Sequence, residues 1–116
     1  MKYLLLLRFA PGVGPEEGPE LEVEMKRWGA LNEEMQAAGV LAGGAGLALD
    51  SATTVRVAEG DRVLTDGPFA ETKEVLFSYY LLDLPDLDAA VDWAAKMPCA
   101  AYGSVEVRPL SDAEQG

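Results

Sequence analysis

Histidine is missing from this chain of 116 residues. Its absence excludes Ser-His-Asp and Cys-His catalysis, because both mechanisms need an imidazole as the general base. It also argues against a conventional zinc site, where histidine and cysteine supply most of the ligands. We expect neither a metal nor another cofactor, because no group of acidic residues has a recognisable metal-ligand spacing; a carboxylate-bound magnesium or manganese ion is the alternative. Any acid-base chemistry must therefore use carboxylate, lysine or tyrosine side chains.

Cysteine is almost missing too, since Cys99 is the single one in the sequence. One cysteine excludes an intramolecular disulfide, a Cys-x-x-Cys redox pair and a thiolate metal cluster. Cys99 follows Pro98 at the expected end of a helix. A small buried hydrophobic side chain is the favoured role there, and a reactive thiol is the alternative.

Basic residues are scarce, with nine lysines and arginines against twenty aspartates and glutamates, for a net charge of −11. Nucleic acid and anionic membranes both need a basic patch, so we expect neither as a partner. The chain also lacks an apolar run of the ~20 residues that span a bilayer. Arg8 interrupts the apolar start of the chain before it resembles a signal peptide, which predicts a cytoplasmic protein.

The acidic residues are most concentrated where the first helix is expected to begin. Carboxylates there interact favourably with the helix dipole, so we interpret this run as a solvated helix start. The run comprises Glu16, Glu17, Glu20, Glu22 and Glu24.

Composition indicates a single folded domain. Hydrophobic residues make up 49% of the chain and charged residues 25%, which is typical of globular proteins. A chain of this length can bury a self-supporting core. We place the domain at residues 1–110 and expect residues 111–116 to be a short disordered tail.

Hydrophobic periodicity predicts strands at 2–9, 40–45, 53–57, 62–65, 75–83 and 102–108, with helices at 19–38 and 86–97. Asp86 is the expected N-cap of the second helix, and Pro98 ends it. Residues 59–61 place Gly60 where a hairpin bulge requires glycine. The order β-α-β, hairpin, β-α-β is typical of an α+β fold, the ferredoxin-like split βαβ sandwich with an inserted β-hairpin.

The strands at 2–9 and 75–83 carry apolar residues on both faces, although two helices can cover only one face of a sheet. A bare apolar sheet face indicates an interface, so we expect a homodimer with sheet packed on sheet. Polar residues on these strands and the last strand are candidates to line a cleft between subunits. They are Arg8, Ser78, Tyr80, Glu106 and Arg108.

The segment Asp66–Glu74 joins two predicted strands and is longer and more charged than an ordinary hairpin connection. Gly67 and Pro68 have a backbone explanation as turn formers. The charged residues after them need a different explanation. Loops on a rigid scaffold often contain catalytic or ligand-binding residues. We therefore place the candidate site at this segment.

The segment Val63–Glu74, followed by Phe77–Leu82, resembles the signature of the DGPF group of YCII-related proteins. The resemblance continues through Leu87–Ala94 and Tyr102–Pro109, and so covers nearly the whole chain. It implies a dimeric ferredoxin-like α/β barrel.

The same resemblance implies two kinds of function. Broader YCII relatives are thought to use a His-Asp pair in acid-base chemistry, and one relative acts on chlorinated hydroxyquinols. That pair cannot operate here, because this chain has no histidine. Members of the DGPF group are also often encoded beside sigma factors of the extracytoplasmic-function type, which implies a regulatory role and a possible sigma-factor partner.

Three interpretations of the segment therefore stay open. It is a structural loop, or part of a small-molecule enzyme such as a lyase, isomerase or dehalogenase, or a ligand-sensing or protein-binding surface. In the enzyme, Asp66 or Glu71 is the general base, and Lys73, with Arg8 or Tyr80, polarises a carbonyl or holds an anion. The candidate ligand-binding residues are Arg8, Gly67, Pro68, Phe69, Ser78 and Tyr80.

Overall fold

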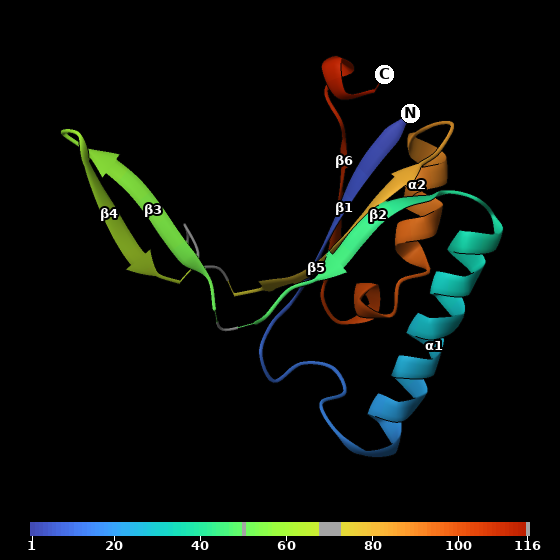
Figure 1. Ribbon diagram of the computed structural model, residues 1–116. Helices are drawn as coiled ribbons and strands as arrows, with labels where there is room; N and C mark the ends of the chain where they lie inside the picture. The colour runs from blue at the N-terminus through green and yellow to red at the C-terminus, as the bar shows by residue number, and fades with distance from the viewer. Residues whose placement is uncertain (50, 68–72, 116) are drawn as a thin grey trace.

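A four-stranded antiparallel sheet forms the body of the protein, with the strand order β2-β5-β1-β6. The computed structural model describes residues 1–49, 51–67 and 73–115. Helices α1 and α2 cover one face of this sheet, and the hairpin β3–β4 projects from the opposite side (Figure 1). The strands are β1 (Lys2–Phe9), β2 (Leu41–Gly46), β3 (Thr53–Ala58), β4 (Asp61–Asp66), β5 (Val75–Asp83) and β6 (Ser104–Pro109), and the helices are α1 (Gly18–Ala37) and α2 (Leu87–Ala95).

This arrangement confirms the expected α+β class and the predicted order of elements. Asp86 caps α2 as predicted, since its side chain accepts a hydrogen bond from the backbone N–H of Ala89 at 2.9 Å. The helix ends at Ala95, earlier than predicted, and Pro98 instead begins the 3-10 helix η1 (Pro98–Ala101). Proline suits that position because its missing N–H would have no helical partner there. The described residues include no helix that is both long and apolar enough to cross a membrane.

The hydrophobic core lies between the sheet and the two helices. Tyr3, Leu5 and Leu7 of β1 are buried, and they alternate with residues that are only partly buried. Because successive strand side chains point to opposite faces, this alternation places the buried set toward the helices. The core is completed by Leu31, Met35, Leu82, Leu84, Ala90, Ala94, Met97 and Cys99. The burial of Cys99 confirms the favoured interpretation of the lone thiol.

The other face of the sheet, which we call the open face, carries a smaller apolar centre. Strand register pairs Leu4 with Leu81 and Leu6 with Tyr79, so these four side chains share that face. They are partly buried within one chain. The second apolar face that the sequence predicted is therefore present, and no helix covers it (Figure 1).

The turn of the β3–β4 hairpin differs from the prediction. Ala58 pairs directly with Asp61, so the connection consists of two residues and contains no bulge. Glu59 and Gly60 both adopt positive φ, at 53° and 83°. This is the geometry of a two-residue hairpin turn, whose twist matches that of the flanking strands.

Glu24 is also placed differently from the solvated helix start that was predicted. Its side chain is buried and accepts a hydrogen bond from the Tyr102 hydroxyl at 2.9 Å. Gly14 permits this contact, because a Cβ atom there would lie 2.6 Å from the Tyr102 ring. The pair joins α1 to the segment that leads into β6, and burial together with the Glu24 carboxylate raises the pKa of Tyr102.

The C-terminal segment is more ordered than the predicted tail. Residues Asp112–Glu114 form a short 3-10 helix. The Gln115 side chain then donates hydrogen bonds to the carbonyls of Lys2 and Leu110, at 3.1 and 2.9 Å. These backbone partners hold the segment against β1, which is why the two termini lie close together in Figure 1.

Gly103 is the position where the fold tolerates a side chain least. A Cβ atom there would lie 2.0 Å from the backbone oxygen of Arg8, whereas one at Gly29 in α1 would meet nothing within 4 Å. We predict that Gly103→Ala lowers the free energy of unfolding by about 3 kcal/mol. Gly29→Ala should raise it by about 0.5–1 kcal/mol, because alanine favours a helix interior. Urea unfolding of both variants measures the difference, and equal effects would contradict it.

Cys99 gives a second prediction, because burial raises the pKa of its thiol to about 12. At pH 8 the native thiol should react with a disulfide reagent at least about a hundredfold more slowly than in urea. The unfolded thiol ionises near pH 9, while the native thiol stays neutral until about pH 12. Ionisation therefore stabilises only the unfolded chain in this range, and the free energy of unfolding falls as the pH rises from 9 to 12. Cys99→Ala should make the urea midpoint decline less between pH 8 and 10. Rapid reaction of the native protein with the disulfide reagent would contradict the burial of Cys99.

Candidate functional site

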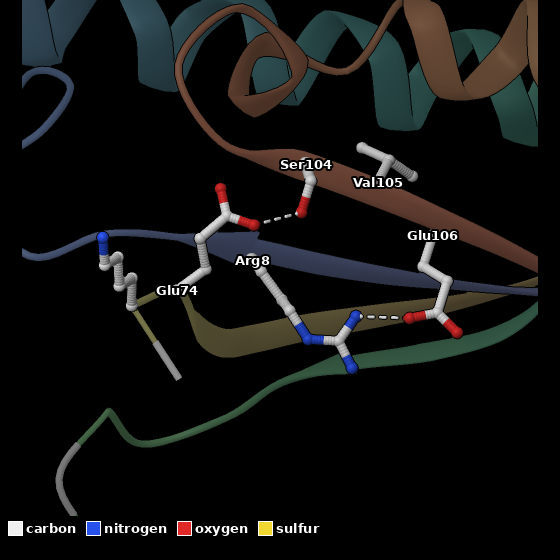
Figure 2. A pocket seen from close by; sticks show the side chains of 6 residues that line it. Arg8, Glu74, Ser104, Val105 and Glu106 are labelled. Atoms are coloured by element: carbon white, nitrogen blue, oxygen red, sulfur yellow. Dashed lines mark hydrogen bonds and ion pairs between the residues drawn. The ribbon is translucent and has the colours of Figure 1, made fainter. Parts of the chain in front are cut away.

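A polar cleft of about 480 Å³ lies at one end of the sheet, on the side of the open face. Figure 2 shows side chains from the end of β1 and the start of β6 converging there with residues that precede β5. The cleft is lined by Arg8, Lys73, Glu74, Ser104, Val105 and Glu106. Three segments that are distant in the sequence therefore form a single cleft.

Antiparallel pairing explains why these segments meet. The C-terminal end of β1 lies beside the N-terminal ends of both β5 and β6, with Arg8 paired to Leu76 on one side and Ser104 on the other. The β1–β5 register shifts between Leu7 and Arg8. Such irregularities bend a strand locally and reorient its side chains, and they are common beside functional sites.

An aromatic cluster supports the cleft from the helix side. The Phe77 ring packs edge-on against Phe9, with centroids 5.1 Å apart, and against Trp28 of α1 at 6.4 Å. Edge-to-face contacts of this kind contribute roughly 0.5–1.5 kcal/mol each beyond the area they bury. They fix the end of β1 against α1 and so fix the backbone that carries Arg8.

Arg8 is the central cation of the cleft. Its Nη1 atom donates to Glu106 Oε1 at 2.8 Å, and the Arg8 side chain is only 28% exposed. Arg108 approaches the other oxygen of Glu106, with Nε at 3.5 Å. Among the described residues, Glu106 is the hydrogen-bond partner of Arg8, so this contact uses only part of the capacity of the five guanidinium N–H donors.

The Glu74 carboxylate forms the opposite wall. The Ser104 hydroxyl donates to Glu74 Oε1 at 2.6 Å, a short distance that is typical of a hydroxyl bonded to a carboxylate. Lys73 precedes Glu74 and lines the same cleft. The cleft thus combines two cations, Arg8 and Lys73, with the carboxylates of Glu74 and Glu106.

The structure separates the site residues proposed from the sequence into groups. Arg8 and Lys73 lie in the cleft. Asp66 and Gly67 lie at the base of the hairpin, where the Gly67 N–H donates to the Ala52 carbonyl at 2.6 Å and Thr54 Oγ1 donates to the Gly67 carbonyl at 2.7 Å. Asp66 is exposed and does not line the cleft. Pro68, Phe69 and Glu71 lie outside the described residues.

Tyr80 and Ser78 do not line the cleft. Tyr80 pairs with the buried Leu5 and packs against the core, and its hydroxyl donates to Asn32 Oδ1 on α1 at 3.3 Å. Burial raises the pKa of Tyr80. The Ser78 hydroxyl donates to the Ala45 carbonyl of β2 at 3.2 Å. Sequence alone did not reveal this separation, because it does not show which face of β5 packs against the helices.

Three residues of the cleft, Glu74, Ser104 and Val105, were not among the proposed site residues. The signal for Ser104 was present in the period-2 alternation, because Ser104, Glu106 and Arg108 share one face of β6. The signal for Glu74 was its place immediately before β5, where a loop residue meets the ends of the neighbouring strands.

Comparison with solved structures finds proteins of similar fold. Among them is 5-chloro-2-hydroxyhydroquinone dehydrochlorinase from Burkholderia phenoliruptrix AC1100, in complex with 2,5-dihydroxybenzoquinone. The TM-score is 0.51 at 13% sequence identity, and the match covers 96% of this chain and 94% of the other. At this identity the likeness concerns the fold, which is consistent with the ferredoxin-like arrangement.

Sequence comparison gives a relative and a family. An uncharacterized protein of Rhizobium meliloti (strain 1021) is 48% identical over 63 residues, which are 53% of this chain and 51% of that protein. The matched segment thus spans about half the length of that relative. The model of the YCII-related domain matches residues 1–114. Because that match extends over almost the entire sequence and the fold agrees with it, the chain belongs to the YCII-related family.

Proposed function

We propose that the cleft binds a small oxygenated molecule, such as an anion with carbonyl, phenolate or carboxylate oxygens. The position of Arg8 carries this proposal. Its side chain is partly buried at the cleft, and a single protein hydrogen bond uses only part of its donor capacity among the described residues. A guanidinium that is partly removed from water gains most from oxygen acceptors that reach several of its N–H groups.

The other side chains of the cleft fit the same class of ligand. Lys73 adds a second positive charge, and Glu74 with Ser104 offers an acceptor and a hydroxyl for neutral oxygens. The solved structure of similar fold holds 2,5-dihydroxybenzoquinone, a ring with oxygens around its edge. We use this compound as the model ligand for the cleft of the present protein.

The proposal includes a homodimer in which two open faces pack together as a dimeric α/β barrel. The apolar centre of Leu4, Leu6, Tyr79 and Leu81 lacks cover within one chain. A second copy would bury it by a two-fold arrangement in which the same patch meets itself. The cleft lies beside this centre, so the second copy would also restrict the access of water to Arg8. Lower local polarity strengthens the ionic contacts to a bound ligand.

Calorimetric titration with 2,5-dihydroxybenzoquinone tests the binding proposal. Arg8→Ala should weaken binding by about tenfold to a hundredfold, because it removes charge-assisted hydrogen bonds. Arg108→Ala is the matched control, since Arg108 also contacts Glu106 but is 67% exposed and does not line the cleft. Its effect should stay within about twofold. Equal effects of the two substitutions, or no binding by the wild-type protein, would refute the proposal.

A second candidate function is cofactor-independent elimination or isomerisation at the same cleft. The contact between Glu74 and Ser104 favours it, because it places a carboxylate at the cleft beside two cations. Glu74 would take a proton from a carbon next to a carbonyl group, and Lys73 or Arg8 would stabilise the negative charge on the carbonyl oxygen. In a chlorinated substrate, the electron pair of the broken C–H bond would then expel chloride. The solved structure of similar fold is a dehydrochlorinase, which supports a test of this chemistry.

Chloride release from 5-chloro-2-hydroxyhydroquinone measures this candidate activity. We expect Glu74→Gln to lower kcat at least about a hundredfold, since a general base contributes on that order. Affinity for 2,5-dihydroxybenzoquinone should change much less. Asp66→Asn is the control, because Asp66 lies outside the cleft and its removal should leave kcat within about twofold. If the wild-type protein releases no chloride, the enzymatic candidate fails while ligand binding can still stand.

A further inference from the structure

Glu106 is already bonded to Arg8, the central cation of the proposed binding cleft. It lines the cleft, and Figure 2 shows the Arg8 guanidinium directed at its carboxylate. Glu106 Oε1 lies 2.8 Å from Arg8 Nη1, a distance typical of a charge-assisted hydrogen bond. A ligand that binds Arg8 must therefore share the guanidinium with this carboxylate or take its place.

Positive and negative charges balance in the cleft, among the residues that the structure describes. Arg8 and Lys73 are positive, and Glu74 and Glu106 are negative. A cleft lined by charges of one sign concentrates ligands of the opposite sign. The balanced cleft lacks that attraction, and the net charge of −11 on the whole chain adds a repulsion of anions at longer range.

Arg108 offsets little of the Glu106 charge. Its Nε atom lies 3.5 Å from Glu106 Oε2, and its side chain is 67% exposed. Exposed ion pairs of this kind contribute little because water screens them. The Arg8 side chain is only 28% exposed, and its contact with Glu106 is shorter. The negative charge of Glu106 therefore acts mainly on Arg8 and on whatever approaches it.

The charge of a ligand decides how strongly Glu106 opposes its binding. A carboxylate, phosphate or enolate that approaches Arg8 also approaches the Glu106 carboxylate, which is bonded to the same guanidinium. Like charges at such short range repel each other strongly enough, near a protein surface, to weaken binding about fivefold to tenfold. An uncharged phenol or ketone is not repelled, and its oxygen can still accept a hydrogen bond from Arg8.

We propose that Glu106 determines which ligand charge the cleft accepts, and that it favours uncharged phenols and ketones over anions of similar size. This inference rests on the proposed binding function of the cleft and narrows its class of ligand. The carboxylate holds Arg8 before a ligand binds, and an uncharged oxygen shares the guanidinium with it. An anion binds the same guanidinium only against the repulsion of Glu106.

Calorimetric titration of Glu106→Gln with a charged ring and an uncharged ring tests this inference. At pH 7 the acidic hydroxyls of 2,5-dihydroxybenzoquinone are ionised, whereas hydroquinone is uncharged. Glutamine keeps the size of the side chain and an oxygen that can accept from Arg8, so the substitution removes the charge alone. It should tighten the binding of 2,5-dihydroxybenzoquinone by about fivefold to tenfold and change that of hydroquinone by less than about twofold.

Glu33→Gln is the matched control, because it changes the net charge of the chain by the same amount. Glu33 is exposed on α1 and does not line the cleft. Its substitution should leave the affinity for both rings within about twofold, since salt screens distant surface charges. The Glu106 side chain is 45% exposed, so its replacement should not unfold the protein, and circular dichroism checks that both variants are folded.

The direction of the change separates charge selection from a purely structural role. If Glu106 only orients Arg8, its substitution should weaken the binding of both rings. That result, an unchanged affinity for 2,5-dihydroxybenzoquinone, an equal gain for both rings, or an equal gain from Glu33→Gln would overturn this inference alone. Wild-type protein that binds 2,5-dihydroxybenzoquinone but not hydroquinone would do the same. Wild-type protein that binds neither ring would overturn the proposed function as well.

Discussion

The close approach of Gly103 to the Arg8 carbonyl is the constraint on which the site depends. The hypothetical Cβ distance of 2.0 Å shows that only glycine fits between the end of β1 and the start of β6. This approach lets Ser104 pair with Arg8 and brings β6 into register along β1. Without it, the edge strand would move away from β1, and the two sides of the cleft would separate.

Several contacts around this point act together. The buried bond between Tyr102 and Glu24 anchors the residue before Gly103 to α1. The aromatic contacts of Phe77 anchor the other side of β1 to the same helix. Helix α1 therefore fixes both backbones that carry the cleft, although it contributes no side chain to the cleft itself. This division of roles is typical of sites whose polar groups lie on rigid strands.

The proposed binding cleft and the proposed dimer have a common physical origin. The two helices cover one face of the sheet, and no helix covers the apolar centre of Leu4, Leu6, Tyr79 and Leu81 on the other face. The proposed two-fold assembly would bury this centre despite the repulsion between two chains of net charge −11. The cleft would then lie at the border of the assembly, so ligand binding and association would concern the same strand ends.

Sequence by itself determined the order of strands and helices, the burial of Cys99, the helix cap at Asp86 and the apolar character of both faces of β1. These features follow from local periodicity and composition, which do not depend on distant parts of the chain. The absence of histidine likewise restricted the available chemistry to carboxylate, lysine and tyrosine groups. Tertiary structure alone decided that Tyr80 faces the helices, that Glu24 is buried, and that Glu74 and Ser104 meet beside Arg8. Those outcomes depend on strand register and on a backbone approach near Gly103, which bring together residues far apart in the chain and therefore leave no local periodic signal.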